Sequence, residues 1–318
     1  MDNYERTEKL GEGTWGIVWA AVNRKTGQKV ALKSISNKME GMKFGHGLNF
    51  AALREVKLLQ EIQHENVIEL VDVFVEAPST VVLAFEVCVG DLENILTEPS
   101  MVLTPAHIKC HTLQLLRAVD HIHRQWILHR DIKPANMLYT SNGVMKLTDF
   151  GLARAYGDRS AVLTANVVTS WYRPPELLFG AQYYGAAVDV WSVGCVFAEL
   201  YLRRPLFGTS APGDLDQLAT VFRITGTPTM ENWPNHDALP HFVQFSPTPP
   251  LDLKTILTAA SADALDLLRR MVALDPSRRI MAAEALEHEY FQLAPAASKA
   301  EELPPLPGKD KPPAKEKK

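Results

Sequence analysis

The pattern of apolar and polar side chains divides the chain into two parts of different character. In the first 85 residues, short runs of β-branched and apolar side chains lie between turn residues, which is typical of strands. The predicted strands cover residues 16–22, 29–33, 67–75 and 80–85, with a turn at 25–27. Between them, apolar side chains recur at helical spacing over Phe50–His64 and predict one helix.

From about Asp91 onward, helical spacing dominates. Thr104 is suited to cap a helix and Pro105 to its first turn, so we expect a helix from there to about Arg124. Further helices are predicted over residues 186–202, 214–224, 262–272 and 282–289. One hairpin interrupts this part, because two short apolar runs, 137–139 and 144–147, flank an Asn-Gly pair that suits a type I′ turn.

These patterns predict an α+β fold with two lobes. We divide the chain into an N-terminal lobe (1–85), a hinge (86–90), a helical C-terminal lobe (91–292) and a tail (293–318). The tail holds six prolines, six lysines and no aromatic residue among its 26 residues. Such a segment buries too little surface to order itself, so we expect it to be disordered.

Composition narrows the class of protein. The 318 residues carry 33 basic and 37 acidic side chains, a net charge of −4, which argues against direct binding of nucleic acid or of a membrane surface. The start of the chain lacks the apolar core of a secretory signal, and no apolar run is long enough to span a bilayer. The three cysteines, Cys88, Cys110 and Cys195, form no C-x-x-C pair, which favours a reducing compartment.

The first candidate for chemistry is the glycine-rich stretch Gly11–Gly16. A strand rather than a helix follows it, so it is expected to form a hairpin that can cover a triphosphate. Lys33 lies on the next strand, and Glu55 lies on the predicted helix. An ion pair between them would hold the ammonium against phosphate groups. Taken alone, the glycine-rich stretch could be an ordinary tight turn, and Lys33 could be an ordinary solvated lysine.

The strongest signal is His129–Asn136 followed by Asp149-Phe150-Gly151. Asp131 can accept a proton from an attacking hydroxyl group, and Lys133 can neutralise a phosphoryl group in transfer. Asn136 and Asp149 offer oxygen atoms of the kind that Mg²⁺ prefers. A capped turn and a simple β-turn would explain each stretch separately, but the occurrence of all these motifs in this order by chance is very improbable.

Together these motifs resemble those of the eukaryotic protein kinases, and the resemblance covers roughly residues 4–291. It implies the two-lobed protein kinase fold, with a small β-rich N-lobe and a larger helical C-lobe, and the cofactors ATP and Mg²⁺. It also implies that Glu176 pairs with Arg279 and that Asp189 braces the catalytic loop. Lys33, Glu55, Asp131, Lys133 and Asn136 would be the catalytic residues, and Asn136 and Asp149 the metal ligands.

The same resemblance assigns the nucleotide site to residues of both lobes. Phe85 would be the gatekeeper, the backbone at Glu86 and Cys88 would bind adenine, and Asp91 would bind the ribose. An exposed thiol at Cys88 would be open to alkylation. The full set of implied nucleotide-binding residues is Leu10, Gly11, Glu12, Gly13, Val18, Ala31, Lys33, Phe85, Glu86, Cys88, Asp91, Lys133, Asn136, Leu138 and Asp149.

Within the kinases, the chain resembles the cyclin-dependent group, and most of all its kinase-activating branch, the catalytic subunits of the TFIIH kinase module. Ala52–Glu55 resembles the cyclin-docking helix motif, although Phe50-Ala51 replaces a more polar start. Val167–Arg173 resembles the activation segment of proline-directed kinases. The resemblance implies a cyclin regulatory subunit, an assembly factor and TFIIH as partners, and Ser/Thr-Pro sites as substrates. It implies action in the nucleus, with the cytoplasm as a second location.

Regulation is expected at Thr164, which the resemblance marks as the site of activating phosphorylation. Arg54, Arg130 and Arg154 would bind the phosphate, whose charge of about −2 attracts guanidinium groups. Trp15 stands where cell-cycle members of the group carry a tyrosine that is phosphorylated for inhibition.

Three alternatives stay open. A cyclin-dependent kinase with a cell-cycle role would share the same motifs, although Trp15 speaks against it. A catalytically silent, cyclin-binding scaffold would keep the fold without turnover. A MAP kinase would carry Thr-x-Tyr in its activation loop, where this chain has Thr164–Asn166.

Overall fold

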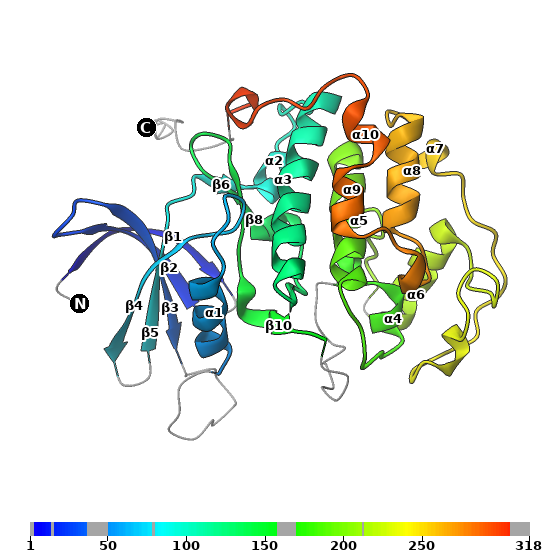
Figure 1. Ribbon diagram of the computed structural model, residues 1–318, viewed down its shortest axis with the longest axis horizontal. Coiled ribbons are helices and arrows are strands. Elements are labelled where there is room, and N and C mark those ends of the chain that lie inside the picture. The colour runs from blue at the N-terminus through cyan, green and yellow to red at the C-terminus, as the bar shows by residue number, and fades with distance from the viewer. Residues whose placement is uncertain are drawn as a thin grey trace, which may run out of the picture.

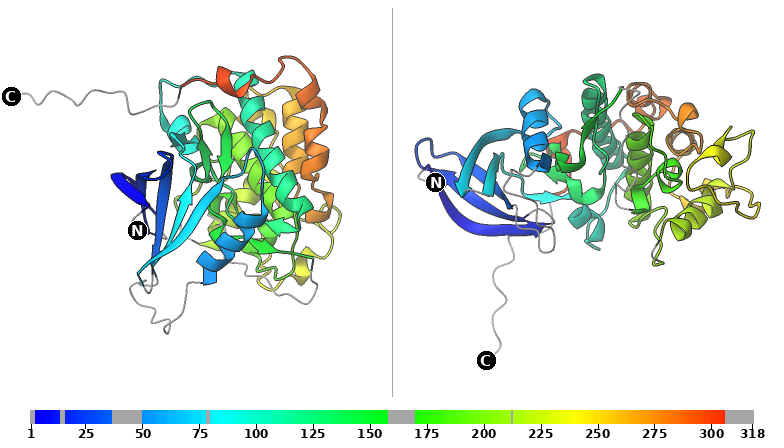
Figure 2. Two further views of the ribbon diagram at one scale, coloured as in Figure 1. Left: turned by 60° about the vertical axis from the view of Figure 1, so that its left-hand side comes forward. Right: turned by 90° about the horizontal axis from the view of Figure 1, so that it is seen from below.

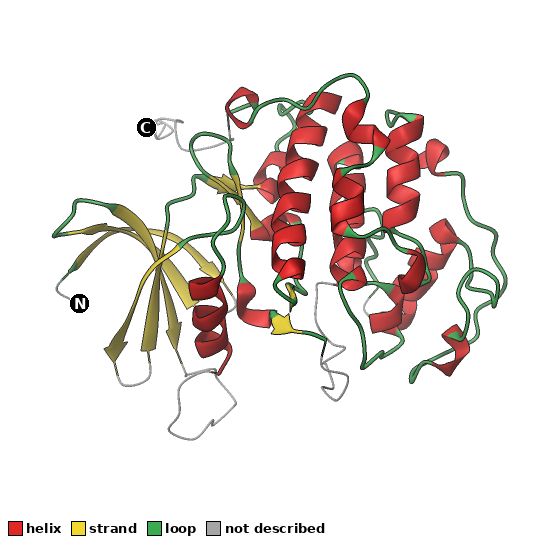
Figure 3. Cartoon of the chain, viewed as in Figure 1, coloured by secondary structure: helices red, strands yellow, loops and turns green. Residues whose placement is uncertain are grey.

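The computed structural model describes residues 3–13, 16–36, 50–77, 80–157, 170–211 and 213–305. A strand-rich lobe lies beside a larger helical lobe, as expected for the protein kinase fold (Figure 1, Figure 3). The strands are β1 (Tyr4–Gly13), β2 (Gly16–Asn23), β3 (Lys29–Ser36), β4 (Leu70–Ala77), β5 (Thr80–Phe85), β6 (Gly90–Asp91), β7 (Ile127–Leu128), β8 (Met137–Tyr139), β9 (Met145–Leu147) and β10 (Arg154–Ala155). The α-helices are α1 (Phe50–Glu61), α2 (Leu92–Thr97), α3 (Pro105–Arg124), α4 (Pro175–Leu178), α5 (Ala187–Leu202), α6 (Asp214–Thr225), α7 (Leu253–Ile256), α8 (Ala262–Met271), α9 (Ala282–Leu286) and α10 (Glu289–Gln292).

The small lobe is built on an antiparallel sheet with strand order β1-β2-β3-β5-β4. The predicted strands at 16–22, 29–33 and 80–85 are confirmed. The strand predicted over 67–75 begins only at Leu70, because Val67 and Ile68 leave the sheet and are buried between the lobes. Val67 forms an isolated bridge with Leu147 of β9, which joins the two lobes through the backbone.

The large lobe is organised around α3 and α5. The predicted start of α3 is confirmed, since the Thr104 side chain accepts a hydrogen bond from the His107 backbone N–H. Nearly all of α5 is buried, as its continuous apolar sequence requires. The helix predicted over 282–289 is in fact two helices, α9 and α10, because the His288 side chain caps the Tyr290 backbone N–H and starts a new helix. Among the helices described, none combines the length and apolar character needed to cross a membrane.

The hairpin of β8 and β9 forms where it was predicted, but its turn type was predicted wrongly. Tyr139 pairs with Met145, so five residues connect the strands instead of the two that a type I′ turn closes. Gly143 has a φ of +75°, whereas Asn142 stays at negative φ, although a type I′ turn needs positive φ at both central positions.

Disorder from Leu293 onward was also predicted wrongly for the part that the structure describes. Residues 293–305 run back over α3, and the Ser298 backbone N–H donates to the Ala106 carbonyl (3.1 Å). The buried Lys109 ammonium donates to the carbonyls of Leu293 (2.6 Å) and Pro295 (2.8 Å). The composition of the segment did not indicate this order, because the order comes from contacts with α3 and not from a core within the segment itself. Residues 306–318 lie outside the described residues.

The ion pair implied between Glu176 and Arg279 is confirmed and lies in the core of the large lobe. Two Arg279 nitrogens donate to the Glu176 carboxylate at 2.5 and 2.6 Å, and the guanidinium lies over the Trp191 ring. Both side chains are almost completely buried. The pair joins α4, which directly follows the activation segment, to the base of the lobe.

Candidate active site

A cavity of about 350 Å³ lies where the two lobes meet, and it contains most of the residues expected to bind a nucleotide. Apolar side chains of β1, β2, β3 and β8 form its walls, and the segment after β5 forms its rear. The expected residues that line it are Leu10, Gly11, Val18, Ala31, Lys33, Phe85, Glu86, Cys88, Asp91 and Leu138. Glu12 and Gly13 close β1, but the position of the Glu12 side chain lies outside what the structure describes.

Five further residues line this cavity that the sequence did not single out: Ile68, Val89, Gly90, Asn94 and Thr148. Asn94 donates to both oxygens of the Asp91 side chain, through its backbone and its side-chain amide, as Asp91 caps α2. Thr148 directly precedes Asp149, so its position could have been read from that motif. Ile68 had no such signal, because its apolar stretch was taken for a strand.

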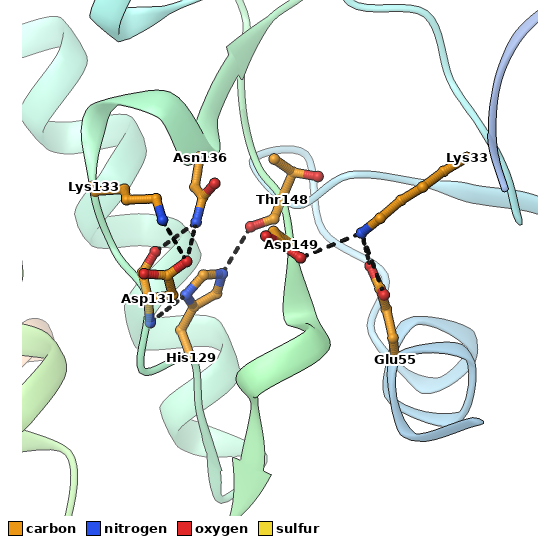
Figure 4. Close-up of polar contacts among 8 residues, drawn as sticks. All are labelled: Lys33, Glu55, His129, Asp131, Lys133, Asn136, Thr148 and Asp149. Carbon is orange, nitrogen blue, oxygen red and sulfur yellow. Dashed lines mark hydrogen bonds and ion pairs between the residues drawn. The ribbon is translucent and has the colours of Figure 1, made fainter. Parts of the chain in front are cut away.

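A group of three charged side chains joins the lobes beside the cavity (Figure 4). The Lys33 Nζ atom lies 3.0 Å from Glu55 Oε1 and 3.3 Å from Asp149 Oδ1. Burial lowers the pKa of Lys33, but the two carboxylates outweigh it, so the pKa is raised and the ammonium stays charged. The predicted Lys33–Glu55 ion pair is therefore present. Together with Asp149, it connects β3, α1 and the loop after β9.

A second polar cluster is formed by the loop between β7 and β8. The Asp131 Oδ2 atom accepts hydrogen bonds from Lys133 Nζ (2.8 Å) and Asn136 Nδ2 (2.9 Å), as Figure 4 shows. Asn136 Nδ2 also donates to the Asp131 backbone carbonyl, at 2.7 Å. Among the described residues no donor contacts Asp131 Oδ1, so this oxygen is available to a hydroxyl group from outside.

The chemistry of the Asn136 and Asp149 side chains fits a magnesium ion. The Asn136 amide nitrogen is used on Asp131, which turns its oxygen away from that carboxylate (Figure 4). Asp149 adds carboxylate oxygens from the neighbouring strand end. Two hard oxygen ligands are what Mg²⁺ takes from protein when phosphates and water complete its shell.

The backbone around this cluster is held in a strained shape. Arg130 and Asp149 have φ values of 67° and 65°, in the left-handed region that side chains other than glycine rarely adopt. The buried Asp189 carboxylate accepts the backbone N–H groups of His129 (2.9 Å) and Arg130 (2.8 Å), and it also contacts His123. This confirms that Asp189 braces the loop. Burial raises the pKa of Asp189, but His123 and these donors outweigh it, so the pKa is lowered and the group stays ionised.

The expected regulatory residues are only partly within the described chain. Arg130 donates to the Leu152 carbonyl and to the Tyr184 hydroxyl group. Arg154 starts β10, which pairs with β7. Burial raises the pKa of Tyr184, and the guanidinium groups of Arg130 and Arg154 both act to lower it, so both lie near this hydroxyl group. Thr164 and the side chain of Arg54 lie outside the described residues.

The two clusters and the cavity between the lobes define a nucleotide-dependent phosphotransferase of the protein kinase class. The sequence profile of the protein kinase domain matches residues 4–291, and the chain belongs to this family, within its cyclin-dependent branch.

Three comparisons support this assignment. Cyclin-dependent kinase 7 of Dictyostelium discoideum is 46% identical over 292 residues, which is 92% of this chain and 80% of that protein. Serine/threonine-protein kinase KIN28 of Saccharomyces cerevisiae is 45% identical, over 93% of this chain and 95% of that protein. A chain in the structure of the CAK complex from Chaetomium thermophilum bound to ATP-γ-S is 41% identical and matches with a TM-score of 0.87, over 95% of this chain and 94% of that one.

The Cys88 thiol in the cavity is a poor nucleophile. It is only partly exposed, burial raises its pKa to about 12, and the Glu86 carboxylate acts in the same direction. Alkylation was expected only of an exposed thiol, and Cys88 is instead a partly buried residue of the cavity wall whose thiolate form is scarce at neutral pH.

We predict that iodoacetamide labels Cys88 of the folded chain about 10³-fold more slowly than it labels glutathione at pH 8, since only about 10⁻⁴ of the thiol is ionised. The rate should rise steadily with pH up to 10. Mass spectrometry of the labelled peptide measures it, and the urea-unfolded chain serves as the control with ordinary reactivity. A rate that levels off near pH 9 would show an ordinary thiol.

Proposed function

We propose that this chain is the catalytic subunit of a CDK-activating kinase. It transfers the γ-phosphoryl group of ATP to Ser or Thr in the activation loops of other cyclin-dependent kinases and in the C-terminal domain of RNA polymerase II. The observation that carries the proposal is the contact of Asp131 with Lys133 and Asn136 beside the Lys33–Glu55–Asp149 group. The near full-length likeness to cyclin-dependent kinase 7 and KIN28 supports this choice among kinases.

Each charged side chain of the cleft has a role in this reaction. Lys33, held by Glu55, orients the α- and β-phosphates, and Asn136 and Asp149 hold Mg²⁺. When bound, the metal ion neutralises charge on the phosphates. Lys133 Nζ is placed to neutralise the moving phosphoryl group. The rate gain comes from positioning and charge, because phosphoryl transfer needs little covalent help from the protein.

Asp131 acts as the proton acceptor. Its Oδ2 atom is fixed by Lys133 and Asn136, which orients Oδ1 toward the space where a substrate hydroxyl group would attack. From this position the carboxylate can accept the proton of the attacking hydroxyl group.

The cavity is suited to a nucleoside. Leu10, Val18, Ala31 and Leu138 enclose a flat apolar volume for adenine, and the backbone at Glu86 and Cys88 supplies hydrogen bonds. Phe85 limits its depth. Asp91 takes the ribose, and the hairpin that contains Glu12 and Gly13 covers the phosphates.

The partners follow from the cyclin-dependent family. A cyclin binds at α1 and thereby sets the position of Glu55, an assembly factor stabilises the pair, and the complex joins TFIIH in the nucleus. The structural relative in a CAK complex supports this proposal. Arg173 pairs with Asp214 at 2.9 Å and helps to form the site for the proline after the phosphorylated residue. Val168 is the second residue of this site, and it lies outside the described residues.

Two alternative functions are compatible with the fold. A cell-cycle cyclin-dependent kinase would have the same cleft. A silent scaffold is less favoured, because every polar side chain that transfer requires is present and in contact.

We predict that Asp131→Asn lowers turnover with added cyclin by about 10²- to 10⁴-fold, because the amide cannot take the hydroxyl proton. ATP affinity should change by no more than about twofold, since Asp131 does not line the nucleotide cavity. Transfer of ³²P to a Ser-Pro peptide and to its Ser-Ala counterpart measures turnover and proline preference together. The exposed Asp237→Asn is the matched control. Full turnover by D131N would refute the assigned role.

Thr164 is proposed as the activating phosphorylation site, with Arg54, Arg130 and Arg154 as its partners. Thr164→Ala should lower activity and cyclin affinity by about tenfold each, because a clamp of up to three charge-assisted bonds is lost. Kinetic assays and cyclin titration on the fully phosphorylated chain measure both effects. If T164A matched the phosphorylated wild type in both assays, the loop would be controlled in another way.

A further inference from the structure

The C-terminal strap, residues 293–305, is fitted against the large lobe on the side away from the substrate end of the cleft. Figures 1 and 2 show it crossing the start of α3 and reaching the hairpin of β8 and β9. At Gly143 the fit is so close that a Cβ atom would lie 2.0 Å from the Ala300 carbonyl oxygen. Ala300–Glu302 form a short 3-10 turn at this contact, so the strap rests on a surface that closely fits this turn.

Between the strap and the lobe a large cavity remains, which we call the rear groove. Its volume is about 460 Å³, within the range of sites that bind ligands. Five strap residues form one wall, and residues of the large lobe, both apolar and polar, form the other. The groove is lined by Val89, Ile95, Met101, Leu103, His111, Tyr139, residues 140–143, Ala300, Glu301, Leu303, Pro304 and Pro305.

The mouth of the groove exposes apolar surface that the strap leaves uncovered. Val89 is 44% exposed, and Val102, which lies between two lining residues, is 74% exposed. Exposed apolar side chains next to a cavity that the described residues leave unfilled are typical of a surface that binds a protein.

The strap itself indicates what the groove accepts. Leu303-Pro304-Pro305 is apolar and extended, because proline fixes φ and favours that shape. Its order depends on the groove, since its composition cannot order it. In the portion after Pro295, the Ser298–Ala106 hydrogen bond is the one backbone bond to the lobe among the described residues. An occupant held in this way can be exchanged.

We propose that the rear groove is a docking site for an extended, leucine- and proline-containing segment of a partner protein, and that the strap covers one side of it in cis until such a segment displaces the strap. Val89 lines both the rear groove and the nucleotide cavity, and its backbone N–H donates to the Tyr139 carbonyl (2.8 Å). A docked partner is therefore held next to the cleft without contact with the catalytic residues.

The test uses a fluorescent peptide with the sequence of residues 296–305 and the full-length chain. Leu303→Asp should free the groove, because it places a charge against the apolar wall. The peptide should then bind the L303D chain at least about tenfold more tightly than the wild type, in which the tethered strap competes at a high effective concentration. Leu293→Asp makes the same change at an exposed strap position outside the groove, and it should behave as the wild type.

A second variant tests the wall of the groove that the large lobe forms. Ser141 is exposed in the hairpin loop and lines the groove, so Ser141→Arg in the L303D chain should abolish peptide binding. If L303D does not fold, hydrogen exchange of the wild type replaces it. Excess peptide should then remove protection from the Ser298 amide, which donates to the Ala106 carbonyl of the large lobe.

Three results would overturn the proposal. The first is equal peptide binding by the wild type and L303D, or binding by neither. The second is peptide binding that leaves the Ser298 amide protected. The third is a wild-type dimer, seen by light scattering, that L303D dissolves, because the groove would then take a second copy of the chain.

Discussion

The buried carboxylate of Asp189 is the constraint on which the site depends. By accepting the backbone N–H groups of His129 and Arg130, it holds Arg130 in a left-handed conformation that costs free energy and that the sequence alone would not adopt. This conformation turns the next residue, Asp131, toward Lys133 and Asn136. The Asp189 carboxylate, which comes from α5 and not from the loop, thus controls where the Asp131 carboxylate lies, and the core around α5 keeps Asp189 in place.

The other half of the site is assembled from three separate segments. Lys33 comes from the sheet, Glu55 from α1 and Asp149 from the loop after β9, and they meet only while α1 lies against the sheet. A partner that moves α1 therefore changes the charge that faces the phosphates. This coupling explains in physical terms why a kinase of this kind can depend on a cyclin.

The sequence predicted the contacts around Asp131 well because the residues of that motif have fixed local spacing, as in the five positions from Asp131 to Asn136. It predicted strands and helices where apolar periodicity was clear, as in α3. It failed where order depends on distant contacts. The strap is ordered by Lys109 and Ala106, about 190 residues earlier in the chain, and Ile68 enters the cleft because it leaves the sheet. The Asn-Gly pair located the turn at Gly143 but not its type, and the strained φ of Asp149 has no local signal.

The most direct test of this account is the rate of phosphoryl transfer by Asp189→Asn, measured in a single turnover with ATP affinity measured on the same sample. The amide keeps the size of the side chain but loses its charge and one acceptor, so the loop is no longer held. Transfer should fall by about 10²-fold or more while ATP binds as before, because positioning is lost and the nucleotide cavity is not. A folded D189N chain that transfers phosphate at the wild-type rate would contradict the account.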